Sequence, residues 1–227
     1  MDTVILAGGR GARLEGVAAP FWKPLFVVNG EPLIVKVARQ GVTINLGRTV
    51  VVVSPENAQP ICQVLAAHEL TGAVDIVVQP MPGGPGAAYL RATPLLHGEM
   101  VMILCADNVI PDADIDRCRN SPGRLVIGTR VIEDAAEARR FTLVGPNKEI
   151  SEGAATGMDW EDGKYRAWLG PLVVDSRGMA TAIYNQRRAG ELMIGSNLDI
   201  YMHVTTGAPL ELVEVDAYDI GSPDDQS

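Results

Sequence analysis

The sequence has no long hydrophobic run, and this absence argues against a membrane-spanning helix. Its longest apolar stretches, such as residues 50–53 and 100–106, are far shorter than the roughly 20 residues that such a helix needs. The chain starts with Asp2 and a strand-like run, unlike the charged and apolar regions of a signal peptide. We therefore expect a cytoplasmic protein that does not contact a membrane.

Basic residues are scarce relative to acidic ones. Lysine and arginine number 19 against 28 aspartates and glutamates, which gives a formal net charge of −9. A general nucleic-acid binder needs a basic face that displaces counterions from the phosphate backbone, so we expect no nucleic-acid partner. An anionic small molecule is still compatible with this charge, because a local cluster of arginine, lysine and backbone amides can hold one.

Cysteines and histidines are few, and their spacing indicates no site. Cys62, Cys105 and Cys118 form no CxxC pair, and we expect reduced thiols in or near the core. The three histidines share no spacing typical of metal ligands, and no Ser-His-Asp or Cys-His set is suggested. The sequence therefore gives no reason to expect covalent catalysis.

Short apolar runs alternate with segments of helical spacing over the first 130 residues. The runs are rich in β-branched residues and apolar on both faces, as in buried strands; they cover residues 3–7, 49–54, 74–79, 101–106 and 125–129. Helical spacing covers residues 32–40, 58–68 and 87–96. This alternation predicts an α/β fold with a mostly parallel sheet flanked by helices. A length of 227 residues predicts one domain, residues 1–227.

The pattern changes after about residue 130. Strand-like segments separated by polar turns cover residues 141–144, 149–151 and 166–175. They predict an antiparallel extension of the sheet in the second half of the chain. A helix over 179–189 and a final strand over 210–215 complete the expected order.

Residues 5–33, ILAGGRGARLEGVAAPFWKPLFVVNGEPL, place glycines and two cations directly after the first predicted strand. Ligands of open α/β sheets bind at the carboxyl ends of the parallel strands. Glycines there let the backbone approach an anion, and Arg13 and Lys23 would add positive charge. The loop is neither a P-loop nor a GxGxxG motif, so the glycines by themselves favour a tight turn over a phosphate site.

The whole string is more specific than its glycines. L-A-G-G-x-G-x-R-L, then K-P ten residues after the arginine, then VNGEPLI resembles the signature of sugar-phosphate nucleotidylyltransferases. The resemblance implies a Rossmann-like fold whose loop wraps the triphosphate of an NTP. It implies that Arg13 holds the β- and γ-phosphates and that Lys23 bridges the α-phosphate and the incoming phosphate, both as catalytic residues. The implied nucleotide-binding residues of this region are Leu6, Gly8, Gly9 and Gly11.

A second segment resembles the base-reading part of the same family. VVQPMPGGPGAA, residues 77–88, matches Q-P-x-P-x-G. The resemblance nominates Gln79 and Gly84 as nucleotide-binding residues. A glutamine amide suits thymine or uracil, which favours dTTP or UTP, although an amide can turn over to suit another base.

Two further segments resemble the family's metal-binding strands. VMILCADNVIP, residues 101–111, nominates Asp107, and VDAYDIGSPDD, residues 215–225, nominates Asp219 as a second carboxylate. Mg²⁺ prefers oxygen ligands and is usually held by one or two carboxylates plus substrate phosphates. Mg²⁺ is therefore the implied cofactor. Nearby competitors for the second carboxylate are Asp216, Asp224 and Asp225.

The acceptor side departs from the family pattern. Where the family carries E-K-P, residues 149–157 read EISEGAATG, in which Glu152 stands for the acid and no lysine follows. Three other cations could take the place of this missing lysine: Lys148, Lys164 and Arg166. The other nominated acceptor-binding residues are Asn108, Thr142 and Gly170. Arg139 and Arg140 are expected at solvated helix positions.

The resemblance implies a Mg²⁺-dependent nucleotidylyltransferase that transfers NMP from an NTP to a sugar 1-phosphate. Residues 1–130 would bind the nucleotide and residues 131–227 the acceptor, and a homo-oligomer is compatible with the family. One alternative is a non-hexose phosphate acceptor, as in molybdenum-cofactor-type or cytidylyltransferase-like enzymes, which the missing lysine favours. The other is a regulatory module that binds nucleotide without turnover, which the presence of both cations and both carboxylates disfavours.

Overall fold

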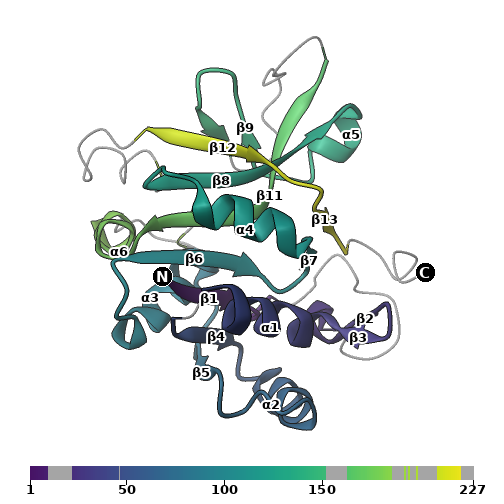
Figure 1. Cartoon of the computed structure of the whole chain (residues 1–227), viewed down its shortest axis with the longest axis vertical. Helices are drawn as coiled ribbons and strands as arrows, with labels where there is room; N and C mark the ends of the chain where they lie inside the picture. The colour runs from purple at the N-terminus through teal and green to yellow at the C-terminus, as the bar shows by residue number, and fades with distance from the viewer. Residues whose placement is uncertain are drawn as a thin grey trace.

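A nine-stranded sheet organises the computed structural model, which describes residues 1–9, 22–45, 47–151, 163–185 and 209–220, with 192, 194 and 198 (Figure 1). Its strands are β1 (Asp2–Leu6), β4 (Thr49–Val53), β5 (Asp75–Val78), β6 (Met100–Cys105), β8 (Leu125–Ile132), β9 (Leu143–Val144), β10 (Ile150–Ser151), β11 (Tyr165–Asp175) and β12 (Leu210–Glu214). The main path runs β10-β9-β11-β6-β1-β4-β5, and β8 and β12 branch from β11. This arrangement confirms the predicted single α/β domain.

The first half of the chain forms the parallel part of the sheet. β1 pairs with β4 and β6, and β4 pairs with β5, all in parallel. Each of these four strands lies within two residues of its predicted position. Because the strands are parallel, their carboxyl ends meet at one edge, which is where ligands of such sheets bind.

Helices cover both faces of the sheet. They are α1 (Leu33–Asn45), α2 (Ala58–Ala67), α3 (Gly84–Ala92), α4 (Asp112–Asn120), α5 (Ala135–Ala138) and α6 (Ser176–Asn185). Alternate strand residues face opposite sides: Ile5 packs in a cluster with α1, α2 and α4, whereas Val4 packs with α3 and α6. Burial on both faces explains why the strands read as continuous apolar runs. None of the helices in the described residues is both long and apolar enough to cross a bilayer.

The second half forms the predicted antiparallel extension. β11 runs antiparallel to β6 and β8, and β12 returns parallel to β8. The register of β11 against β8 shifts between Trp168 and Leu172. At this irregularity Gly128 and Gly170 lie face to face, and a Cβ on Gly170 would come within 2.7 Å of the Cα of Gly128. Close approach of two strands therefore requires glycine at both positions.

Only α2 matches the sequence-based expectation closely: α1 continues to Asn45, five residues beyond its predicted end, and the short α5 was not predicted. α4 was missed, because only Ile115 and Cys118 give it a buried apolar face. α3 begins earlier than predicted and ends at Ala92, where the chain continues as the 3₁₀ turn η3 (Thr93–Leu95). α6 begins at Ser176, and the predicted continuation beyond residue 185 lies outside the described residues.

Candidate active site

A pocket of about 700 Å³ opens at the carboxyl ends of the parallel strands. The loops that follow β1, β4, β5 and β6 supply one side of it. The second half of the chain supplies Arg140, Phe141, Thr142, Trp168 and Asp219. The two predicted halves of the chain therefore meet at one cavity, at the edge of the sheet where a ligand is expected.

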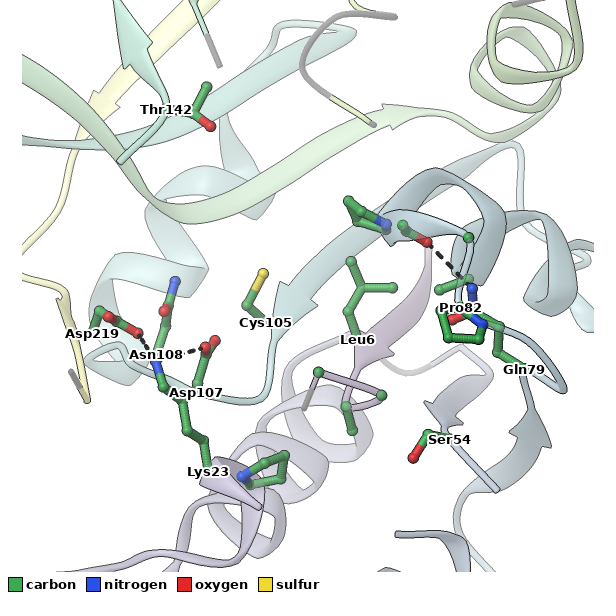
Figure 2. Close-up of a pocket in the computed structure, with 18 of the residues that line it drawn as sticks. Leu6, Lys23, Ser54, Gln79, Pro82, Cys105, Asp107, Asn108, Thr142 and Asp219 are labelled. Atoms are coloured by element: carbon green, nitrogen blue, oxygen red, sulfur yellow. Dashed lines mark hydrogen bonds and ion pairs between the residues drawn. The ribbon is translucent and has the colours of Figure 1, made fainter. Parts of the chain in front are cut away.

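Lys23, Asp107 and Asp219 form the charged centre of this pocket (Figure 2). The Lys23 Nζ lies 3.4 Å from Asp107 Oδ2 and 3.3 Å from Asp219 Oδ1. The side chains of Lys23 and Asp219 are only 11% and 9% exposed, whereas that of Asp107 is 35% exposed. One cation thus bridges two carboxylates that lie 112 positions apart in the sequence.

Two pairs of short strands bring these three residues together. β7 (Asn108–Val109) pairs antiparallel with β13 (Tyr218–Asp219), which places Asp219 opposite Asn108 (Figure 1). β2 (Val27–Val28) and β3 (Glu31–Pro32) form a hairpin directly after Lys23. A separate apolar cluster joins both pairs, and consists of Phe26, Val28, Leu33, Val109 and Ile220. The position of the charged centre therefore depends on apolar packing beside it.

The electrostatics of the centre favour an additional cation. Burial raises the pKa of Asp219, and the negative charge of Asp107 raises it further, while Lys23 and Arg140 oppose the shift. A carboxylate that is costly to ionise where it stands gains from any positive charge placed beside it. The described residues contain no group of three or more His, Cys, Asp or Glu that could hold a metal ion. The described residues therefore offer a cation two carboxylates, Asp107 and Asp219.

Cys105 lies at the floor of the same pocket, open to it on one side (Figure 2). Protein packed around the sulfur, together with Asp107 and Asp219, raises the pKa of the thiol to about 12. The thiol is therefore neutral at physiological pH and a poor nucleophile. Of the cysteines expected in or near the core, Cys118 is buried, Cys105 ends the buried strand β6 and is exposed to the pocket, and Cys62 is exposed on α2.

Leu6, Gly8 and Gly9, which the sequence nominates as nucleotide-binding residues, line the pocket. A Cβ on Gly8 would lie 3.4 Å from the Ser54 backbone nitrogen, so this glycine sits tightly against the next loop. A Cβ on Gly9 would meet nothing within 4 Å, so the backbone there is open toward the pocket. The predicted residues Gly11 and Arg13 lie outside the described residues.

Gln79, directly after β5, and Gly84, at the start of α3, also line the pocket. The Gln79 Nε2 donates a long hydrogen bond of 3.5 Å to the carbonyl oxygen of Gly84. Gly84 has a φ of 78°, a left-handed conformation that favours glycine. The two residues predicted to read the base thus lie next to each other, and their role in base recognition stays a prediction.

Asn57 fixes the loops that carry Gly8 and Ser54, and the sequence analysis missed it. Its fully buried Nδ2 donates to the carbonyl of Ala7 at 2.7 Å, and its Oδ1 accepts from the Ser54 backbone at 2.8 Å. The Asn57 backbone in turn donates to Ser54 Oγ at 3.3 Å. A buried asparagine just before a helix resembles an ordinary cap in the sequence, so its contact with the first loop gave no signal.

Replacing Asn57 with alanine should lower the free energy of unfolding by about 2–4 kcal/mol, because buried backbone groups of two loops lose their partners. Urea denaturation measures this change. Asn120→Ala is the matched control, since Asn120 is exposed at the end of α4 and should change stability by less than about 0.5 kcal/mol. Equal losses in the two variants would contradict the role assigned to Asn57.

Only some of the residues predicted to bind the acceptor line the pocket. Asn108 and Thr142 line the pocket, and the Asn108 Nδ2 donates to the carbonyl of Leu169 at 2.8 Å. Gly170 packs against Gly128 and does not line the pocket, and its predicted contact with an acceptor stays a prediction. Glu152 lies outside the described residues.

Arg140 is the pocket cation that the sequence analysis placed wrongly. α5 ends at Ala138, so Arg140 follows the helix and lines the pocket, with its Nη2 3.6 Å from Asp219 Oδ2. The three candidates for the missing lysine are engaged elsewhere: Lys148 donates to the carbonyl of Leu210, Lys164 pairs with Glu133, and Arg166 donates to Thr129.

Comparison with curated proteins identifies partial relatives. The chain is 28% identical over 141 residues to a glucose-1-phosphate thymidylyltransferase from Actinoplanes sp., covering 60% of this chain and 46% of the relative. It is 31% identical over 117 residues to a protein of Acanthamoeba polyphaga mimivirus assigned as a UDP-N-acetylglucosamine pyrophosphorylase, covering 52% and 42%. The matched part spans less than half the length of either relative.

Solved structures share the fold over almost the entire chain. A Bacillus anthracis protein assigned as a glucose-1-phosphate thymidylyltransferase, in complex with sucrose, has a TM-score of 0.79 at 19% identity, covering 99% of this chain and 91% of that one. The inositol-1-phosphate CTP transferase from T. maritima has a TM-score of 0.73 at 18% identity, covering 100% and 91%. HddC from Yersinia pseudotuberculosis, complexed with GMP-PN, has 0.71 at 17%, covering 99% and 96%. At these identities the likeness shows the fold.

A family model settles the relationship. The model of the MobA-like NTP transferase domain matches residues 3–124, which include the opening loop, the Gln79 segment and Asp107. The match confirms the predicted kind of family at the level of a nucleotidyltransferase domain. Because it spans more than half of the chain, and the fold agrees over nearly all of it, the chain belongs to the MobA-like NTP transferase family.

Proposed function

We propose that this pocket transfers an NMP group from an NTP to a phosphorylated small molecule and releases pyrophosphate. One observation carries the proposal: Lys23 lies within 3.4 Å of two carboxylates, one from each half of the chain. A protein that only bound nucleotide would have no need of a second carboxylate brought from β13. Two carboxylates and a lysine at the carboxyl end of a parallel sheet suit a reaction in which phosphate charge must be neutralised.

The two carboxylates fit Mg²⁺ as the cofactor. Mg²⁺ is usually held by one or two carboxylates, with substrate phosphates and water as its other ligands, and Asp107 and Asp219 offer that number. Burial of Asp219 beside Asp107 favours a cation between them. When bound, such an ion neutralises phosphate charge and orients the reacting oxygens.

The protein's own residues would act by position and charge. The Lys23 ammonium is placed to hold phosphate oxygens where the two substrates meet, and the open backbone at Gly9 gives the triphosphate room to approach. An oxygen of the acceptor phosphate attacks the α-phosphorus in line, the bond to the β-phosphate oxygen breaks, and pyrophosphate leaves. A phosphate monoester is largely ionised at neutral pH, so no general base is required.

We propose a sugar 1-phosphate as the acceptor and dTTP or UTP as the donor. The Gln79 amide beside Gly84 supports a pyrimidine base. The curated relatives are assigned to glucose 1-phosphate and UDP-N-acetylglucosamine chemistry, which supports a sugar acceptor.

A second candidate keeps the reaction and changes the acceptor to a non-hexose phosphate. The observation that favours it is that neither Lys148 nor Lys164 lines the pocket, so the described residues supply no lysine on the acceptor side. The family model that matches the first half of the chain is the MobA-like one, and a structural neighbour acts on inositol 1-phosphate by its name.

Pyrophosphate release decides between these proposals. The purified chain should be incubated with Mg²⁺, each common NTP in turn, and a panel of sugar 1-phosphates and inositol 1-phosphate. Release that requires a sugar 1-phosphate supports the first proposal, and release that requires inositol 1-phosphate supports the second. Mg²⁺-dependent nucleotide binding without release from any pair would contradict turnover.

A further inference from the structure

Arg140 is more exposed than Lys23, the other cation of the pocket, and its ion pair with a carboxylate is weaker. In the part of the chain that the structure describes, the pocket is lined by two cations, Lys23 and Arg140. Lys23 is almost buried between Asp107 and Asp219. The side chain of Arg140 is 44% exposed, and its distance of 3.6 Å to Asp219 exceeds the roughly 2.7–2.9 Å of a charge-assisted hydrogen bond.

The backbone and a neighbouring ring hold Arg140 in place. Its N–H donates to the carbonyl of Glu137 at 3.0 Å, so the chain turns sharply as it leaves α5. The guanidinium carbon lies 5.7 Å from the ring centroid of Phe141, within the range of a cation–π contact. Phe141 itself packs against the apolar core. A guanidinium carries five N–H donors, so this arrangement fixes the group while leaving donors for a ligand.

The location of Arg140 assigns it to the acceptor side. The two oxygens of Asp219 face different cations, Oδ1 toward Lys23 and Oδ2 toward Arg140. Arg140 therefore pairs with the Asp219 oxygen that Lys23 does not contact, and it lines the pocket together with Thr142, which also comes from the second half of the chain. A phosphate held there would lie beside the charged centre, on the side of the pocket that the second half of the chain supplies.

We propose that Arg140 binds the phosphate of the acceptor, through the planar edge of its guanidinium, and so sets the affinity for phosphorylated acceptors. The inference rests on the proposed nucleotidylyl transfer, because it takes the acceptor to be a phosphate monoester. Two parallel N–H···O bonds match arginine to a phosphate in a way that the point charge of lysine does not. If Arg140 instead only neutralised Asp219, its loss would change the Mg²⁺ requirement and leave the acceptor KM unchanged.

Three variants separate these roles. Arg140→Ala should raise the KM for the acceptor by about 10- to 100-fold, since hydrogen bonds to a charged group are lost, and leave the KM for the NTP unchanged. Arg140→Lys should recover part of the loss, because it keeps the charge without the planar edge. Arg139→Ala is the matched control; Arg139 is exposed, does not line the pocket, and should leave both constants unchanged.

Equilibrium binding supplies a readout that does not depend on turnover. Calorimetric titration of glucose 1-phosphate, inositol 1-phosphate and inorganic phosphate into the Mg²⁺-loaded parent should show binding of a phosphate that weakens in Arg140→Ala and persists in Arg139→Ala. If that pattern appears without pyrophosphate release from any substrate pair, the proposed function fails and the role of Arg140 stands. A changed Mg²⁺ requirement with an unchanged acceptor KM, or no phosphate binding by the parent, would overturn the role of Arg140.

Discussion

Asp219→Asn should abolish turnover and at the same time make the metal-free protein more stable. The expected loss of rate is roughly a thousandfold or more, because a neutral amide no longer contributes charge to a bound cation. The expected gain in stability follows from the raised pKa of Asp219, which burial and the charge of Asp107 produce. An acid whose pKa is higher in the folded state costs stability when it ionises, and asparagine removes that cost.

The pH dependence tests the sign of this argument. Above the raised pKa of Asp219 the parent carries the costly charge, so the variant should melt at a higher temperature than the parent at neutral pH in the presence of a chelator. The difference should disappear as the pH falls below the unfolded-state pKa, where the parent carboxyl is protonated as well. Thermal denaturation across pH 3–8 measures it.

Asp216→Asn is the matched control for both effects. Asp216 is exposed three positions before Asp219, does not line the pocket, and was a competitor for the same role in the sequence. The substitution keeps its backbone hydrogen bond to Asp114. Turnover at the parent rate in Asp219→Asn, or a loss in Asp216→Asn, would show that the second carboxylate has been assigned to the wrong residue.

Lys23→Ala should reduce the rate by about 10²–10³-fold at saturating Mg²⁺ and substrates. Removal of a single fixed donor from a charged transition state has an effect of this size. The variant should also lose stability in a chelator, because Asp107 and Asp219 then face each other without the cation that now lies between them. Added Mg²⁺ should restore the melting temperature while the rate stays low.

Lys164→Ala controls for the loss of a positive charge elsewhere. Lys164 is half-exposed, pairs with Glu133 at 3.8 Å and does not line the pocket. Both the rate and the Mg²⁺ dependence of melting should match the parent. If Lys23→Ala kept its melting temperature in the chelator, the repulsion between the two carboxylates would be weaker than their geometry indicates.

The parallel half of the fold and its site were predictable because their signals are local. The strand Thr49–Val53 is buried on both faces and reads as an unbroken apolar run, which no surface strand resembles. The loop after β1, Gln79 and Asp107 each follow such a run directly, so their positions at one edge of the sheet follow from the topology.

The residues that were missed depend on contacts that no local pattern encodes. Arg140 looks like its neighbour Arg139 in the sequence, and only the end of α5 at Ala138 directs it into the pocket. Asn57 looks like a helix cap in the sequence, but in the structure its side-chain amide donates a hydrogen bond to the carbonyl of Ala7, 50 positions earlier. Only two apolar side chains of α4, Ile115 and Cys118, are buried, which is too few to give a periodic signal in the sequence. The position of α4 follows instead from the strands around it.

The pairing of β7 with β13 has a consequence for synthesis on the ribosome. Lys23 and Asp219 lie 196 positions apart, so translation at 5–20 residues per second separates their appearance by about 10–40 s. The nascent chain can complete the parallel strands, and with them the whole nucleotide side, well before its second carboxylate exists. If the proposed transfer holds, the growing chain would carry the predicted nucleotide-binding residues Gly8 and Gln79 during that interval, and would gain its second proposed metal ligand only when β13 emerges.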